Sequence, residues 1–179
     1  MENQTKKRGA LVAIITMVFL FAMIAFVTTM AAPFGIIWKE HYEWAGMMGN
    51  MMNFVAYFFM GIPASMMITR YGYKKTALSA LALGLIGIGI QLISSKMDGN
   101  SLNTYIIYLL GAFVCGLCVC ILNTVVNPML NLLGGGGNRG NQLIQTGGSL
   151  NSLAATLTPI LTGSMIGQIT KQTSLKVVT

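Results

Sequence analysis

Residues 104–132 read TYIIYLLGAFVCGLCVCILNTVVNPMLNL, an apolar stretch without a charged side chain. An α-helix rises about 1.5 Å per residue, so a helix of this length exceeds the roughly 30 Å hydrocarbon core of a bilayer. Lipid offers no hydrogen-bond partner to the backbone, and the stretch lacks the alternation of a membrane β-strand. It therefore predicts a membrane-spanning α-helix.

Four further apolar runs accompany this stretch, and polar or glycine-rich segments separate them. Hydrophobic residues make up 54% of the 179 residues and charged ones 8%, against about a quarter charged in an ordinary soluble domain. We predict an all-α, polytopic membrane protein with about five transmembrane helices in one bundle, residues 1–168, and a polar tail, residues 169–179. The predicted spans are residues 11–37, 46–68, 76–95, 104–132 and 142–168.

The formal charge of +7 belongs to basic residues at the ends of these runs, without the interleaved aromatic residues of a nucleic-acid surface. We expect no nucleic-acid partner. Because basic residues are preferentially retained on the cytoplasmic side during insertion, their positions predict a multi-pass protein of the plasma (inner) membrane with a cytoplasmic N-terminus. The cytoplasmic segments then hold Lys6, Lys7, Arg8, Arg70, Lys74, Lys75 and Arg139, and the external loops hold Lys39 and Lys96.

Nothing in the sequence indicates enzyme chemistry. The three cysteines, Cys115, Cys118 and Cys120, lie within one apolar run, and the only histidine, His41, lies in another segment, so we expect packing thiols and no metal site. The glycine run 134–137 lacks the Lys-Ser/Thr ending of a phosphate loop, which favours a flexible linker. No protease, hydrolase or kinase motif occurs. We therefore expect no catalytic residue, no metal and no other cofactor.

Amide and hydroxyl side chains recur at helical spacing within three of the predicted spans. An amide that faces lipid is costly, so such stripes are expected to face the protein interior or a water-filled cavity. Uncharged donors and acceptors suit a neutral, polyhydroxylated ligand such as a sugar. Hydrogen bonding between neighbouring helices is the alternative interpretation. The stripes comprise Asn50, Asn53 and Tyr57 in the second span, Asn123, Asn127 and Asn131 in the fourth, and Gln145, Ser149, Ser152 and Thr156 in the fifth, with Asn151 nearby.

The predicted spans contain no carboxylate. The four acidic residues, Glu2, Glu40, Glu43 and Asp98, all lie outside them. Proton-coupled carriers usually need a buried group that loads and unloads a proton, and acidic side chains serve this role most often. No side chain here is placed for that role.

The segment RYGYKK, residues 70–75, resembles the R-x-G-x-[RK]-[RK] end of the cytoplasmic loop that joins the second and third helices of major facilitator transporters. Thr69 stands where that family usually has Asp, which weakens the charge interaction that the family loop uses in gating. The resemblance implies a gating loop made of Arg70, Gly72, Lys74 and Lys75.

Three further motifs are similar to the fucose/glucose-galactose symporter branch of that family. Residues 62–65, IPAS, match its I-P-A-[GS] ending of the second helix. Residues 123–128, NTVVNP, resemble its E-T-A-A-N-P, and the run from Asn151 to Pro159 resembles its N-S-L-x-x-T-x-x-P. The resemblance covers roughly residues 10 to 168.

This resemblance implies a secondary sugar carrier that works by alternating access, with a neutral hexose and the lipid bilayer as partners. Thr29 and Asn123 stand where proton-coupled members place carboxylates, so facilitated diffusion and coupling to another ion both stay open. Residues carried over or selected as candidate substrate ligands are Thr29, Asn50, Asn53, Asn123, Asn127, Gln145 and Asn151.

The family architecture has two six-helix halves around a site at the membrane midplane. With about five predicted helices, the chain is expected to be an N-terminal fragment, partial in its first half, that needs the C-terminal part of the same transporter and is inactive alone. A self-standing five-helix membrane protein that assembles with partners and transports nothing is the alternative.

Overall fold

A computed structural model describes residues 2–41, 43–97 and 102–166, and within these ranges the chain is helical apart from short turns. The elements are α1 (Glu2–His41), the 3-10 helix η1 (Ala45–Met47), α2 (Met48–Lys96), α3 (Leu102–Leu133) and α4 (Gly137–Ile166). The described ranges contain no strand, and the predicted all-α class is confirmed. The polar tail 169–179 and the last residues of the fifth predicted span lie outside the described residues.

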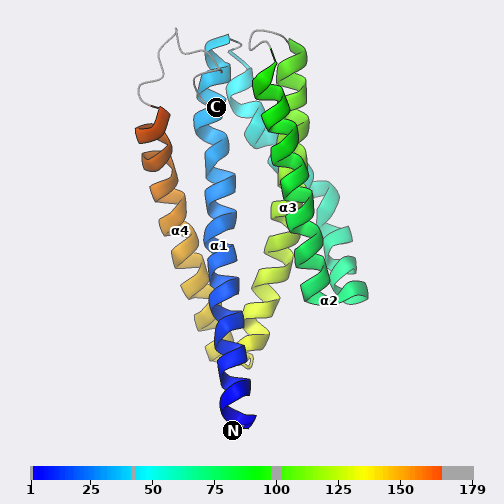
Figure 1. Cartoon of the computed structure of the whole chain (residues 1–179), viewed down its shortest axis with the longest axis vertical. Helices are drawn as coiled ribbons and strands as arrows, with labels where there is room; N and C mark the ends of the chain where they lie inside the picture. Colours follow the sequence, from blue (N-terminus) through cyan, green and yellow to red (C-terminus); the bar gives the residue numbers. More distant parts are fainter. Residues whose placement is uncertain (1, 42, 98–101, 167–179) are drawn as a thin grey trace.

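Helix α2 consists of two arms, residues 48–71 and 73–96, that meet at Gly72. Gly72 has φ 78° and ψ 166°, a backbone conformation that a side chain with a Cβ rarely adopts. The first arm runs parallel to α3, because Gly49 lies beside Tyr108 and Tyr57 bonds Asn123. The second arm runs antiparallel to α3, as Figure 1 also shows. The spans predicted at 46–68 and 76–95 are therefore two antiparallel arms joined at one residue, with no extended loop between them.

Three helical segments are long and apolar enough to cross a membrane: Gly9–Met30, Ala45–Lys96 and Leu102–Leu133. The second is 52 residues long, which at about 1.5 Å per residue suffices for two crossings. These segments confirm a polytopic helical membrane protein. Helix α4 carries many polar side chains and is not among the three, so a fifth crossing over 142–168 stays a prediction.

Helix α3 contacts α1, α2 and α4 and supplies most of the buried core. Its buried side chains include Val119, Val125, Val126 and Leu130, and Phe21 of α1 packs against the same cluster. Both arms of α2 pack on α3, whereas α1 packs mainly on α4 (Figure 1). Large apolar side chains on the outer faces are exposed, as expected where lipid is the solvent.

The second arm of α2 approaches α3 closely through paired glycines. Cys115 and Cys118 are free and buried, and their sulfur atoms occupy the space that a Cβ at Gly87 or Gly84 would need. The thiols thus fill gaps between helices, as expected of packing cysteines.

The segment ends alternate between the two ends of the bundle (Figure 1). The N-terminus, the Gly72 reversal and the α3–α4 turn lie toward one end, and the starts of α2 and α3 lie toward the other. This arrangement agrees with the predicted topology. Which end faces the cytoplasm stays a prediction.

Replacing Tyr105 with Phe is expected to loosen the junction between η1 and α3. Tyr105 is 1% exposed, and its hydroxyl donates a hydrogen bond of 2.9 Å to the carbonyl oxygen of Ala45. Removing the donor leaves the Ala45 carbonyl oxygen bonded to the Met48 backbone N–H, and the loss of one hydrogen bond costs about 0.5–1.5 kcal/mol. Denaturant titration of the purified chain in detergent gives the free energy of unfolding and so measures this loss. Tyr71→Phe, at an exposed tyrosine, is the control, and equal stability of the two variants would contradict the prediction.

A candidate substrate site between α2 and α3

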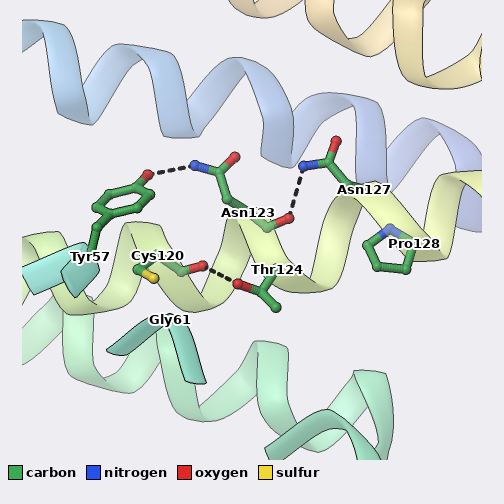
Figure 2. Close-up of a pocket in the computed structure, with 7 residues that line it drawn as sticks. All are labelled: Tyr57, Gly61, Cys120, Asn123, Thr124, Asn127 and Pro128. Carbon is green, nitrogen blue, oxygen red and sulfur yellow. Dashed lines mark hydrogen bonds between the residues drawn. The ribbon is translucent and has the colours of Figure 1, made fainter. Parts of the chain in front are cut away.

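A hollow of about 380 Å³ lies between the first arm of α2 and the second half of α3. Ligand pockets in proteins commonly measure about 300–1,000 Å³, so its size suits a small molecule. On its α2 side the hollow is open at Gly61, because a Cβ added there would meet no atom within 4 Å. Figure 2 shows the lining residues, which are Tyr57 and Gly61 of α2 and Cys120, Asn123, Thr124, Asn127 and Pro128 of α3.

Hydrogen bonds fix the polar side chains of the hollow (Figure 2). The Asn123 amide nitrogen donates to the Tyr57 hydroxyl at 2.6 Å, which ties α3 to α2. The Asn127 amide nitrogen donates to the Asn123 carbonyl oxygen at 3.0 Å, and the Thr124 hydroxyl donates to the Cys120 carbonyl oxygen at 2.8 Å. Within the part of the chain that the structure describes, these bonds leave the amide oxygens of Asn123 and Asn127 able to accept bonds from a ligand.

The lining carries hydrogen-bonding groups but no lysine, arginine, histidine or carboxylate. Amide oxygens accept hydrogen bonds, and the Tyr57 hydroxyl can still donate one. The Tyr57 ring and Pro128 add apolar surface beside these polar atoms. An uncharged site of this kind can hold a neutral ligand that combines hydroxyl groups with C–H surface, without the cost of desolvating an ion.

The structure places Asn123 and Asn127 on one face of α3 beside the hollow, as their i, i+4 spacing predicted, and their role as substrate ligands stays a prediction. Tyr57, recognised only as a member of the second-span stripe, is the partner of Asn123 from the other helix. Gly61 lies four residues after Tyr57 on the same face of α2, a spacing that could have indicated it. Cys120, Thr124 and Pro128 belong to other sequence motifs, which carry no signal for this hollow.

Three other candidate residues lie elsewhere. The Thr29 hydroxyl donates to the Ala25 carbonyl oxygen of its own helix at 2.6 Å. Asn53 faces α3 beside Gly116, and Asn50 is exposed. None of the three lines the hollow.

The polar stripe of α4 also stands apart from the hollow. Gln145 is exposed and Asn151 is half-buried. The hydroxyls of Ser149, Ser152 and Thr156 donate to backbone carbonyls one turn earlier in α4, at 2.9 to 3.0 Å. In the described chain this stripe neither lines the hollow nor joins α4 to a neighbour by these hydroxyl bonds.

The residues expected to form a gating loop surround the reversal in α2. Arg70, Lys74 and Lys75 are exposed, and the Arg70 guanidinium lies 5.8 Å from the centroid of the Tyr71 ring. Gly72 supplies the reversal itself. Their gating role stays a prediction.

Fold and site together define a class: a polytopic helical membrane protein with an uncharged hollow, lined mainly by apolar surface with a few amide and hydroxyl groups, between two helices. In comparisons with known proteins, no family model and no solved structure matches the chain. Two curated proteins do, both named glucose/galactose transporter, from Brucella abortus biovar 1 (strain 9-941) and Brucella abortus (strain 2308). Each is 28% identical over 113 residues, which is 63% of this chain and 26% of the relative.

The chain is therefore similar to sugar transporters over the matched residues, and it spans about a quarter of the length of these relatives. Both relatives are named as transporters and not as enzymes. Their names agree with the class that the fold defines.

Proposed function

We propose that this chain supplies one wall of the sugar path in a secondary carrier of the major facilitator type. The observation that carries the proposal is the uncharged hollow in which Asn123 of α3 bonds Tyr57 of α2 at 2.6 Å. The similarity to two glucose/galactose transporters supports a neutral hexose as the ligand. In this proposal the carrier lies in the plasma membrane with its N-terminus on the cytoplasmic side.

In this proposal the sugar displaces water from the hollow and forms hydrogen bonds with the residues that line it. Sugar hydroxyls donate to the amide oxygens of Asn123 and Asn127, and the Tyr57 hydroxyl donates to a sugar oxygen. Alternating access requires a site shared between two bundles that rock against each other. The contacts from α2 and α3 therefore form one side of that site, and the other side belongs to the opposing bundle.

Transport needs, in the proposal, an opposing wall from a C-terminal part of the carrier, since the relatives are about four times as long as the matched region. Sugar binding in the hollow needs only the residues of this chain that line it. The hollow itself holds no carboxylate or imidazole. We therefore assign it sugar binding and no proton uptake.

A cysteine at position 124 is expected to react with a membrane-impermeant maleimide, because maleimides react with thiolates in water and not with thiols in lipid. The experiment uses the full chain in lipid vesicles, with Cys115, Cys118 and Cys120 replaced by alanine. Thr124→Cys should be labelled, and glucose or galactose should slow the labelling several-fold. Phe58→Cys is the matched control, since Phe58 is 85% exposed on the apolar face of the same α2 arm that carries Tyr57. It should stay unlabelled.

Two results would count against the proposal. Equal labelling at positions 124 and 58, or none at 124, would mean that the hollow is not a hydrated path. Labelling at 124 that sugars leave unchanged would mean a wet hollow without a sugar site.

A further inference from the structure

The charged residues are divided unequally between the two ends of the bundle. Seven of the eleven Lys and Arg residues belong to segments at the end that contains the N-terminus, the Gly72 reversal and the α3–α4 turn, where the only acidic residue is Glu2 (Figure 1). Segments at the other end carry Lys39 and Lys96 together with Glu40 and Glu43. We refer to the first as the basic end.

The basic side chains that the structure describes at this end are exposed and face no carboxylate among the described residues. They are Arg70, Lys74 and Lys75 around the α2 reversal and Arg139 in the first turn of α4. Thr69, next to Arg70, offers no charge, and its hydroxyl donates to the Met66 carbonyl oxygen at 2.9 Å. Among the side chains that the structure describes, this positive charge has no internal counter-charge.

The cations of the reversal are flanked by exposed apolar surface on both arms of α2. Met66, one turn before Arg70, is 65% exposed, and Leu78, one turn after Lys74, is 57% exposed. The ring of Tyr71 lies beside the Arg70 guanidinium, a combination typical of the boundary between hydrocarbon and water. A partner that matches this surface must present negative charge directly beside hydrocarbon.

We propose that the basic end binds anionic lipid headgroups of the phosphatidylglycerol class, with the α2 reversal as the principal contact. Arg70, Lys74 and Lys75 hold the phosphate, and Met66 and Leu78 contact the acyl chains. Clusters of Lys and Arg at the ends of transmembrane helices attract anionic lipid in this way. Inorganic phosphate shares the headgroup chemistry but lacks the hydrocarbon that the flanking residues fit. The proposal does not depend on sugar transport.

Lipid retention by the purified full chain tests the proposal. The chain is exchanged into detergent with an equal mixture of phosphatidylglycerol and phosphatidylcholine, and native mass spectrometry counts the lipids that stay bound. Two doubly substituted variants remove the same charge: Lys74→Gln/Lys75→Gln at the basic end and Lys39→Gln/Lys96→Gln at the other end. Circular dichroism melting shows that each variant is folded.

We expect the natural chain to retain phosphatidylglycerol in preference to phosphatidylcholine. In Lys74→Gln/Lys75→Gln the affinity for phosphatidylglycerol should fall about tenfold or more, since each cation near the surface contributes on the order of 1 kcal/mol. The Lys39→Gln/Lys96→Gln variant should retain it unchanged. Higher ionic strength should weaken the binding.

Three results would overturn the proposal. Equal losses in the two variants would mean that only net charge matters. Equal retention of the two lipids would mean that the headgroup is not recognised. Displacement of phosphatidylglycerol by inorganic phosphate at equal concentration would assign the reversal to a free anion.

Discussion

Replacing Gly61 with leucine is expected to abolish sugar binding while the bundle stays folded. Gly61 lines the hollow, and a Cβ at this position would meet no other atom within 4 Å. A leucine side chain therefore has room to enter the hollow without displacing the helix packing. Because leucine favours helical backbone over glycine by up to about 1 kcal/mol, stability should be unchanged or slightly raised.

Equilibrium dialysis of radiolabelled glucose and galactose against the reconstituted chain measures this effect, and the apparent affinity should fall at least about tenfold when the side chain occupies the ligand volume. Gly89→Leu is the matched control, because Gly89 lies in the second arm of α2, also has no atom within 4 Å of an added Cβ, and does not line the hollow. Undiminished binding by Gly61→Leu would place the sugar elsewhere.

Replacing Gly111 with leucine is expected to separate α3 from the second arm of α2 and to prevent stable folding. A Cβ at Gly111 would lie 3.0 Å from the Gly87 carbonyl oxygen and 3.1 Å from the Gln91 backbone nitrogen. In the reverse direction, a Cβ at Gly87 would lie 2.9 Å from the Cys115 backbone nitrogen. The Gln91 side-chain Cγ, at 2.6 Å from the Gly111 Cβ, is nearer still and could shift, but the backbone atoms cannot rotate away as a side-chain end could.

The two helices would have to move apart along this contact, so the cost should reach or exceed the roughly 1–3 kcal/mol of an overpacked core. Yield of monodisperse protein in detergent and the free energy of unfolding by denaturant titration measure it. Gly87→Leu should behave like Gly111→Leu, and Gly89→Leu, in the same arm, should resemble the unaltered chain. A stable Gly111→Leu variant would show that α3 and the second arm of α2 pack less closely than in the structure.

Some parts of the site could be predicted from the sequence because they depend on one helix only. Asn123 and Asn127 are four residues apart, and a helix places such residues on one face. Neither charge nor periodicity indicates that Tyr57 meets Asn123, since that contact depends on how closely α2 approaches α3. The close contact of Gly116 with Ala56 and Asn53 sets that approach.

Other candidates followed the same periodicity without joining the site. Asn53 and Tyr57 share one face of α2, yet Asn53 lies in the helix contact and Tyr57 in the hollow. The stripe on α4, with Gln145 and Asn151, has the same amide and hydroxyl chemistry, but α4 packs mainly on α1 and its stripe does not line the hollow. Periodicity identifies the polar face of a helix, and it carries no information about what that face meets.

The sequence by itself determined that the chain is helical and built for lipid, because the need to satisfy every backbone group within hydrocarbon acts on each segment separately. It also determined the polar faces and the basic ends. Only the tertiary structure decided that α2 reverses at Gly72, that its first arm runs parallel to α3, and that a hollow opens beside Gly61. These features depend on contacts between residues distant along the chain, which no local pattern of hydropathy specifies.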